Sequence, residues 1–148
     1  MKAPPFSLPD QTGTIHTLAE SDGNWRIVYF YPKDDTPGCT TEACNFRDTM
    51  GVLKENRIVV YGISKDSVKS HQKFADKFSL NFPLLSDPSH EVIEMYGAWR
   101  PKKFMGREYL GIIRKTVLIN PIGEIVKEYE GMKLENHAQD ILKDIPLL

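Results

Sequence analysis

The chain has 148 residues, 41% hydrophobic and 26% charged, which is the composition of an ordinary globular protein. A net charge of −1 and a pI of about 6.4 exclude a global basic field, so we expect neither nucleic acid nor membrane as a partner. No secretory signal, membrane-spanning run or disulfide framework is visible, which favours a cytoplasmic location. We expect a single domain over residues 1–148.

The N-terminal half alternates extended and helical patterns. Extended segments flank a turn at residues 11–13, and the run WRIVYFY at residues 25–31 is typical of a central strand buried on both faces. From Thr40 onwards, apolar residues recur at spacings of three and four, which predicts an amphipathic helix. Residues 57–63 (RIVVYGI) predict a second buried strand, and residues 66–77 predict a second helix.

The C-terminal half continues this alternation. Residues 82–88 predict a short strand and turn, and residues 91–96 a short helix. Strands at residues 114–119 and 124–129 flank a Pro-Ile-Gly turn and predict a hairpin, and residues 135–145 predict a closing helix. This order indicates a thioredoxin-like α/β fold with an N-terminal extended addition.

The only two cysteines, Cys39 and Cys44, stand five positions apart at the start of the first predicted helix. Their spacing differs from the C-x-x-C of dithiol oxidoreductases and from a zinc site. Cys39 follows a strand, a polar turn and Pro-Gly, where unpaired N–H groups and the helix dipole favour an anion. A thiolate is such an anion and is the nucleophilic form of cysteine. The hydroxyl of Thr36 can reach the same pocket.

Plainer interpretations stay open on these residues alone. A cysteine in a globular protein is often a small buried hydrophobe, and Cys39 shares its predicted helix face with Phe46 and Met50. A metal site is disfavoured, because the four histidines are scattered without ligand spacing. We expect His71 and His137 to be surface or capping residues.

The segment YPKDDTPGCTTEACNFRD resembles the active-site segment of peroxiredoxins, specifically the bacterioferritin comigratory protein or peroxiredoxin Q group of atypical 2-Cys type. The general pattern P-x-x-x-T-x-x-C is met by Pro32, Thr36 and Cys39, and the group's T-x-E-A-C-x-F-R-D places its second cysteine at Cys44. APPFSLPDQTG, YGISKDSVKSHQKFADKFSLNFPLLSD and GIIRKTVLINPIGEI resemble the family's opening, its middle and the segment with its essential arginine, here Arg114.

The chain also departs from the family's pattern in three places. Its start is several residues shorter than is usual, LINP stands where LID is common, and residues 99–109 are individual to this chain. None of these departures touches a matched active-site position.

The resemblance implies a thiol peroxidase that reduces hydrogen peroxide and organic hydroperoxides. Cys39 would be the peroxidatic residue, and its sulfenic acid would condense with the resolving Cys44 to an intramolecular disulfide. Thr36 and Arg114 would position the peroxide and stabilise the thiolate, and Pro32 would shield the pocket.

The resemblance also implies a further site residue and a partner. Glu42 resembles the family's acidic residue that orients the arginine. Thioredoxin or a similar dithiol would recycle the enzyme in antioxidant defence, without metal or organic cofactor. The short chain, without a long C-terminal arm, favours a monomer. Two alternatives are a disulfide oxidoreductase on the same fold and a peroxide sensor that signals through the state of Cys39. Repeated peroxide turnover would separate a peroxidase from a sensor.

Overall fold

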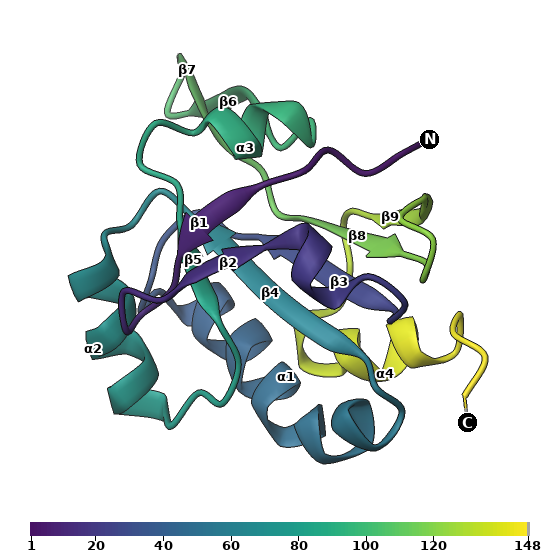
Figure 1. The fold of residues 1–148 in the computed structure, drawn as a ribbon. Coiled ribbons are helices and arrows are strands. Elements are labelled where there is room, and N and C mark those ends of the chain that lie inside the picture. The colour runs from purple at the N-terminus through teal and green to yellow at the C-terminus, as the bar shows by residue number, and fades with distance from the viewer. Residues whose placement is uncertain (148) are drawn as a thin grey trace.

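Five strands form the central sheet, in the order β5-β4-β3-β8-β9. The computed structural model describes residues 1–147 and shows this sheet between two covering layers (Figure 1). β3 (Arg26–Phe30) pairs in parallel with β4 (Val59–Ser64), and β4 pairs in parallel with β5 (Leu84–Ser86). β8 (Lys115–Ile119) lies antiparallel to β3, and β9 (Ile125–Tyr129) lies antiparallel to β8. The predicted strands and their hairpin are confirmed.

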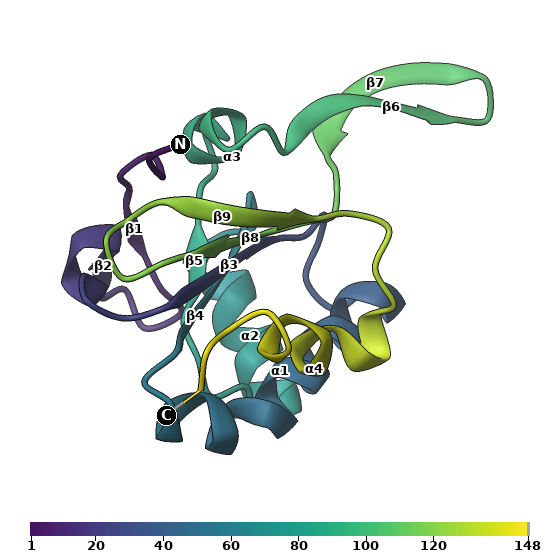
Figure 2. The same cartoon turned by 90° about the vertical axis from the view of Figure 1, so that its right-hand side faces the viewer.

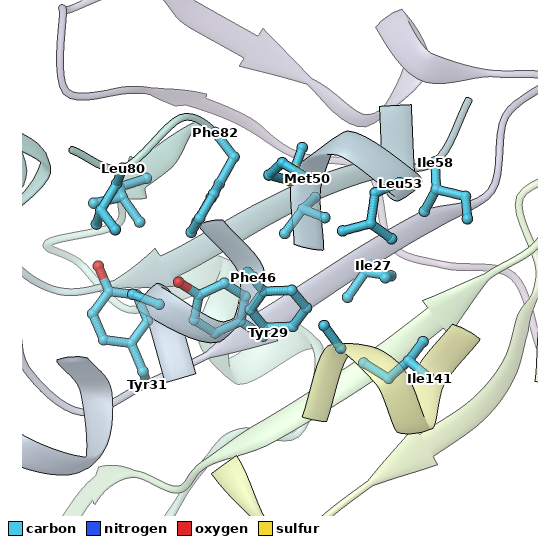
Figure 3. Close-up of a cluster of buried hydrophobic side chains, with 14 of the residues drawn as sticks. Ile27, Tyr29, Tyr31, Phe46, Met50, Leu53, Ile58, Leu80, Phe82 and Ile141 are labelled. Carbon is cyan, nitrogen blue, oxygen red and sulfur yellow. The ribbon is translucent and has the colours of Figure 1, made fainter. Parts of the chain in front are cut away.

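Helices cover one face of the sheet. α1 (Pro37–Glu55), α2 (Val68–Phe78) and α4 (His137–Leu142) lie on this side, with the 3-10 turn η2 (Leu134–Asn136) leading into α4 (Figure 2). The core between them contains stacked aromatic rings and aliphatic side chains (Figure 3). Within residues 1–147, no helix is both long and apolar enough to cross a membrane.

The opposite face is covered by the N-terminal addition and a short helix. β1 (Ser7–Pro9) and β2 (Ile15–Thr17) form an antiparallel pair, followed by the 3-10 turn η1 (Leu18–Ser21). α3 (Glu91–Met95) packs on the same side. Successive side chains of a strand point to opposite faces of the sheet, so the buried strands contribute alternate residues to the core on each face.

A separate hairpin projects from the body of the protein (Figure 2). β6 (Trp99–Phe104) and β7 (Arg107–Ile112) pair antiparallel around a turn at Met105 and Gly106, which both have positive φ. The sequence pattern predicts no strands here. Side chains on both faces of this hairpin are largely exposed, so its residues do not alternate between apolar and polar as those of a half-buried strand do.

Two helices differ most from their predicted bounds, and the other elements shift by one or two residues. α1 begins at Pro37 rather than Thr40, because Thr36 has extended dihedrals as the N-cap and the fixed φ of proline suits the first helical position. The closing helix is shorter than residues 135–145, since its first residues form the 3-10 turn η2 and the regular helix spans only α4.

The core beneath α1 depends on a glycine in β4. The Tyr29 ring lies across Gly62, its partner in the neighbouring strand, and stacks on Phe46 of α1 at 4.8 Å between centroids (Figure 3). A Cβ added at Gly62 would lie 2.8 Å from the Tyr29 ring, so any larger residue displaces the ring that supports the helix.

We therefore expect Gly62→Ala to lower the free energy of unfolding by about 1–3 kcal/mol through overpacking. Gly51→Ala in α1 is the matched control, because nothing lies within 4 Å of the added Cβ. This control should raise stability by roughly 0.5–1 kcal/mol, since alanine is the better helix former. Urea unfolding measures both, and a Gly62→Ala protein as stable as the control would refute the tight Tyr29 contact.

Candidate active site

The polar turn after β3 places Cys39 in the first turn of α1. Thr36 is the N-cap, and Pro37 follows at the first helical position. The Thr36 side chain does not cap the helix; its hydroxyl donates to the Lys33 carbonyl at 2.9 Å. Cys39 is only 1% exposed and belongs to the apolar core under α1, as its predicted helix face requires.

Arg114 reaches Cys39 because of the strand register. Lys115 begins β8 and pairs with Phe30 at the end of β3, so Arg114 lies level with the turn that leads to α1. Its guanidinium Nη2 donates to Cys39 Sγ at 3.1 Å, and its Nη1 donates to Glu42 Oε1 at 2.7 Å. A single cation therefore contacts the thiol and a carboxylate one helical turn apart.

Burial shapes the charges around this cation. Glu42 is fully buried, and burial raises its pKa to about 7 although the Arg114 charge opposes that rise. Burial also acts to lower the pKa of Arg114, but the neighbouring Glu42 and Cys39 outweigh it and the net direction is upward. The guanidinium stays charged, whereas Glu42 changes its protonation close to neutral pH.

Comparisons with known proteins find relatives of this chain in sequence and in fold. The AhpC/TSA family model matches residues 1–128. Peroxiredoxin Bcp of Escherichia coli strain K12 is 46% identical over 95% of this chain and 90% of its own length. Peroxiredoxin Bcp of Bacillus subtilis strain 168 is 42% identical over 97% of this chain and 92% of its own length.

The chain belongs to the AhpC/TSA family, among the Bcp peroxiredoxins. A solved cysteine-to-serine mutant of peroxiredoxin Q from Xanthomonas campestris superposes with a TM-score of 0.89 at 37% identity, covering 94% of this chain and 88% of that one. The predicted family and thioredoxin-like fold are confirmed.

The other predicted site residues of this peroxiredoxin lie around the same helix start. Pro32 is half-buried in the turn between β3 and α1, and Thr36 stands one turn before Cys39. The Thr36 hydroxyl donates its hydrogen to a carbonyl, so its oxygen is left to accept a hydrogen bond. Cys44 is half-buried further along the same unbroken helix, and both thiols are free.

The expectation that His71 and His137 are surface or capping residues was wrong, because both are fully buried. His137 Nε2 lies 2.8 Å from Thr116 Oγ1 and 4.0 Å from Glu42 Oε2, behind the Arg114 contact. Burial lowers the pKa of His137 to about 4, so the ring is neutral near pH 7 and adds no second cation beside Glu42.

His71 belongs to a polar network that the sequence analysis missed. Asp34, in the turn before α1, accepts from Tyr31 at 2.6 Å and from Ser70 at 2.8 Å, and it lies 2.7 Å from His71 Nδ1. His71 Nε2 donates to the Leu85 carbonyl at 3.0 Å. The network fastens the turn that precedes Cys39 to α2 and β5, and only the spacing of a histidine on the buried face of α2 could have indicated it.

Asp34, Asp66 and His71 place their ligand atoms within 4.8 Å of one another, close enough for a metal ion. Protein donors already occupy these atoms, however. The backbone N–H of Asp34 and the Ser64 hydroxyl both donate to Asp66 Oδ2, at 2.9 and 2.7 Å. We therefore interpret the cluster as a structural network of the turn.

The raised pKa of Glu42 makes stability depend on pH. Because its folded pKa of about 7 lies above its ordinary value of 4.5, the folded state holds this proton more tightly, and stability falls as pH rises between those values. At about 1.4 kcal/mol per pKa unit, Glu42→Gln should gain about 2–3 kcal/mol relative to wild type between pH 5 and pH 8. Urea unfolding across that range measures the difference.

Glu55→Gln, an exposed position at the end of the same helix, is the matched control. It should follow the wild-type pH profile throughout. His137, whose pKa is lowered, shifts stability in the opposite sense in all three proteins and cancels from the comparison. Parallel profiles for wild type and Glu42→Gln would show that Glu42 titrates normally.

Proposed function

We propose that Cys39 is the peroxidatic thiol of this peroxidase and Cys44 the resolving thiol. As a peroxiredoxin, the chain reduces peroxides with electrons from a thiol reductant. The observation that supports the assignment is the Arg114 guanidinium 3.1 Å from Cys39 Sγ in the first turn of α1. Structures of the 36% identical Xanthomonas campestris bacterioferritin comigratory protein concern its alkyl peroxide reduction, and we extend that substrate class, with hydrogen peroxide, to this chain.

The first step is attack of the Cys39 thiolate on one peroxide oxygen. An S–O bond forms, the O–O bond breaks, and the departing oxygen takes a proton and leaves as water or an alcohol. Arg114 and the N–H groups of the first turn of α1 donate to the developing charge, while the Thr36 oxygen accepts from the peroxide hydroxyl. Pro32 limits access of water to the thiolate from the side of the turn. Cys39 becomes a sulfenic acid.

The second step joins the two cysteines. The Cys44 thiol displaces the sulfenic oxygen as water and forms an intramolecular disulfide with Cys39. Thioredoxin or a similar dithiol then reduces this disulfide, supplying two electrons and two protons and becoming a disulfide itself. We also place the protein in the cytoplasm, because two cysteines in 148 residues form no disulfide framework, and we propose a monomer, because the proposed disulfide needs no second chain.

Substituting the two thiols separates their roles. Cys39→Ser should abolish peroxide-dependent oxidation of NADPH in an assay with thioredoxin and its reductase. Cys44→Ser should complete one peroxide reduction and stop at a sulfenic acid, which dimedone labelling and mass spectrometry detect at Cys39. A Cys39→Ser protein that keeps turning over would reverse the assignment, and single oxidation of wild type without turnover would favour a sensor.

The second step requires a change in α1. Five residues on a regular helix correspond to a rise of ~7.5 Å and a rotation of ~140°, which places the two Cα atoms roughly 8–9 Å apart. A disulfide needs Cα atoms within about 7 Å and converging Cβ atoms. Because Cys39 and Cys44 lie on one continuous helix, the first turns must unwind before the bond closes.

The contacts of Asn45 set the limit of this unwinding. Its amide Nδ2 donates to the Glu135 carbonyl at 3.0 Å and to Gln139 Oε1 at 2.8 Å, and its Oδ1 accepts from the backbone of Ala138 at 2.7 Å. These bonds fasten α1 to η2 and α4 immediately after Cys44. Thr40 and Thr41, before it, are poor helix formers.

We therefore expect amide exchange to differ between the redox forms. Protection across residues 40–44 should be high in the reduced protein and lost in the disulfide form, while α1 from Phe46 onwards stays protected in both. Asn45→Ala should extend the exchanging segment into the following turn. Equal protection of residues 40–44 in both forms, with the disulfide confirmed by mass, would refute unwinding of the helix.

A further inference from the structure

The projecting hairpin, residues 99–112, is here called the arm, and it is basic and apolar together. Four large apolar side chains of the arm are exposed: Phe104 at 65%, Met105 at 89%, Tyr109 at 49% and Leu110 at 59%. Elsewhere in residues 1–147, exposed apolar side chains are scattered along different elements. Exposed apolar clusters of this kind mark interaction surfaces.

The arm is an appendage with a fixed base. The Ile113 N–H donates to the Ala98 carbonyl at 2.8 Å, so the chain leaves and re-enters the body at neighbouring points. Trp99 stacks on His90 at 3.9 Å between centroids, and Arg100 pairs with Glu130 at 2.7 Å. These contacts attach the base of the arm to the body of the protein.

The tip of the arm is convex and apolar. Phe104 and Met105 stand at the turn, the point of the arm farthest along the hairpin from its base (Figure 2). Lys103 and Arg107 flank them, both exposed, and Glu108 is the only acidic residue among residues 99–112. Two apolar side chains flanked by two cations match a membrane interface, whose headgroups are anionic and whose interior is apolar, although Glu108 stands opposite Lys103 in the hairpin.

We propose that the arm docks this protein on anionic phospholipid bilayers, with Phe104 and Met105 inserted between the headgroups. Lys103 and Arg107 would contact lipid phosphates, and their aliphatic stems would lie along the apolar layer. A convex tip penetrates a fluid surface readily, whereas docking to a protein requires a matching pocket on that protein. This proposal revises the expectation of no membrane partner. That expectation rested on the net charge of the whole chain, which hides the local excess of basic residues in the arm.

Docking through the tip would hold the enzyme at the lipid surface, with the reaction centre beyond the base of the arm. β7 ends at Ile112, two residues before Arg114, whose guanidinium contacts Cys39 Sγ. Hydroperoxides of acyl chains arise in that surface, and a docked enzyme would meet them there. This consequence rests on the proposed function, whereas the docking itself does not.

Vesicle co-sedimentation of the reduced full chain tests the docking. We expect binding to vesicles of equal parts phosphatidylglycerol and phosphatidylcholine, weakening as salt is raised, and much weaker binding to phosphatidylcholine alone. Phe104→Ser with Met105→Ser should lower the affinity by about a hundredfold or more, because the two buried side chains together contribute at least about 3 kcal/mol and each ~1.4 kcal/mol is tenfold. Ile122→Ser, 73% exposed in the β8–β9 turn, is the apolar control and should bind like wild type.

Charge variants test the second part of the contact. Lys103→Gln and Arg107→Gln should each lower the affinity about fivefold, in line with ~1 kcal/mol per basic residue at an anionic surface. Lys54→Gln at the end of α1 is the matched control. In Phe104→Trp, the fluorescence of the new tryptophan should shift to the blue on binding vesicles and be quenched by brominated lipids. Wild type, which has only Trp25 and Trp99, gives the background signal.

Replacing residues 101–110 by Asn-Gly removes the tip and keeps the base, because Arg100 and Gly111 are partners across the hairpin. The shortened protein should reduce hydrogen peroxide at the wild-type rate and lose vesicle binding. Wild type that fails to sediment with anionic vesicles, or arm variants that bind like wild type, would overturn the proposal. If arm variants instead slow only the step with thioredoxin, the arm is a docking surface for the protein reductant and the membrane proposal is wrong.

Discussion

The Arg114 guanidinium binds two buried acidic groups, the Cys39 thiol and the Glu42 carboxyl. Arg114 donates to Cys39 Sγ through one nitrogen and to Glu42 through the other, and both partners are almost completely removed from water. Taking a carboxyl out of water disfavours its charged form, and the shared guanidinium offsets that cost only in part. Burial raises the pKa of Glu42 to about 7, so this carboxyl can be neutral or charged near neutral pH while it stays in contact with Arg114.

The rest of the fold holds the partners of this contact in place. Register between β3 and β8 brings Arg114 level with the start of α1, and the Tyr29–Phe46 stack over Gly62 supports the helix from below. The Asp34–His71 network fastens the intervening turn to α2. These three constraints come from different layers, so the geometry of the thiol depends on packing across the whole sheet.

In the proposed cycle, the start of α1 is a regular helix in the reduced protein and unwinds in the disulfide form. Its first turns contain β-branched Thr40 and Thr41, whereas Asn45 is joined to α4 by three hydrogen bonds. Weak local propensity before Cys44 and strong tertiary contacts after it divide α1 into a part that can unwind and a part that cannot. Local opening of this kind needs only a small share of the total stability.

The sequence by itself determined the family, the order of strands and helices, and the two cysteines, because hydrophobic period and a dense local motif are properties of contiguous residues. It also placed Cys39 in the first turn of a helix. It linked Glu42 to Arg114 only through the family resemblance, and it could not join Asp34 to His71 or bury His137, because those contacts join residues that strand register and helix packing bring together. The arm escaped notice for the opposite reason: its side chains are exposed on both faces, so no buried period marked its strands, and only the tertiary structure shows that they stand clear of the core.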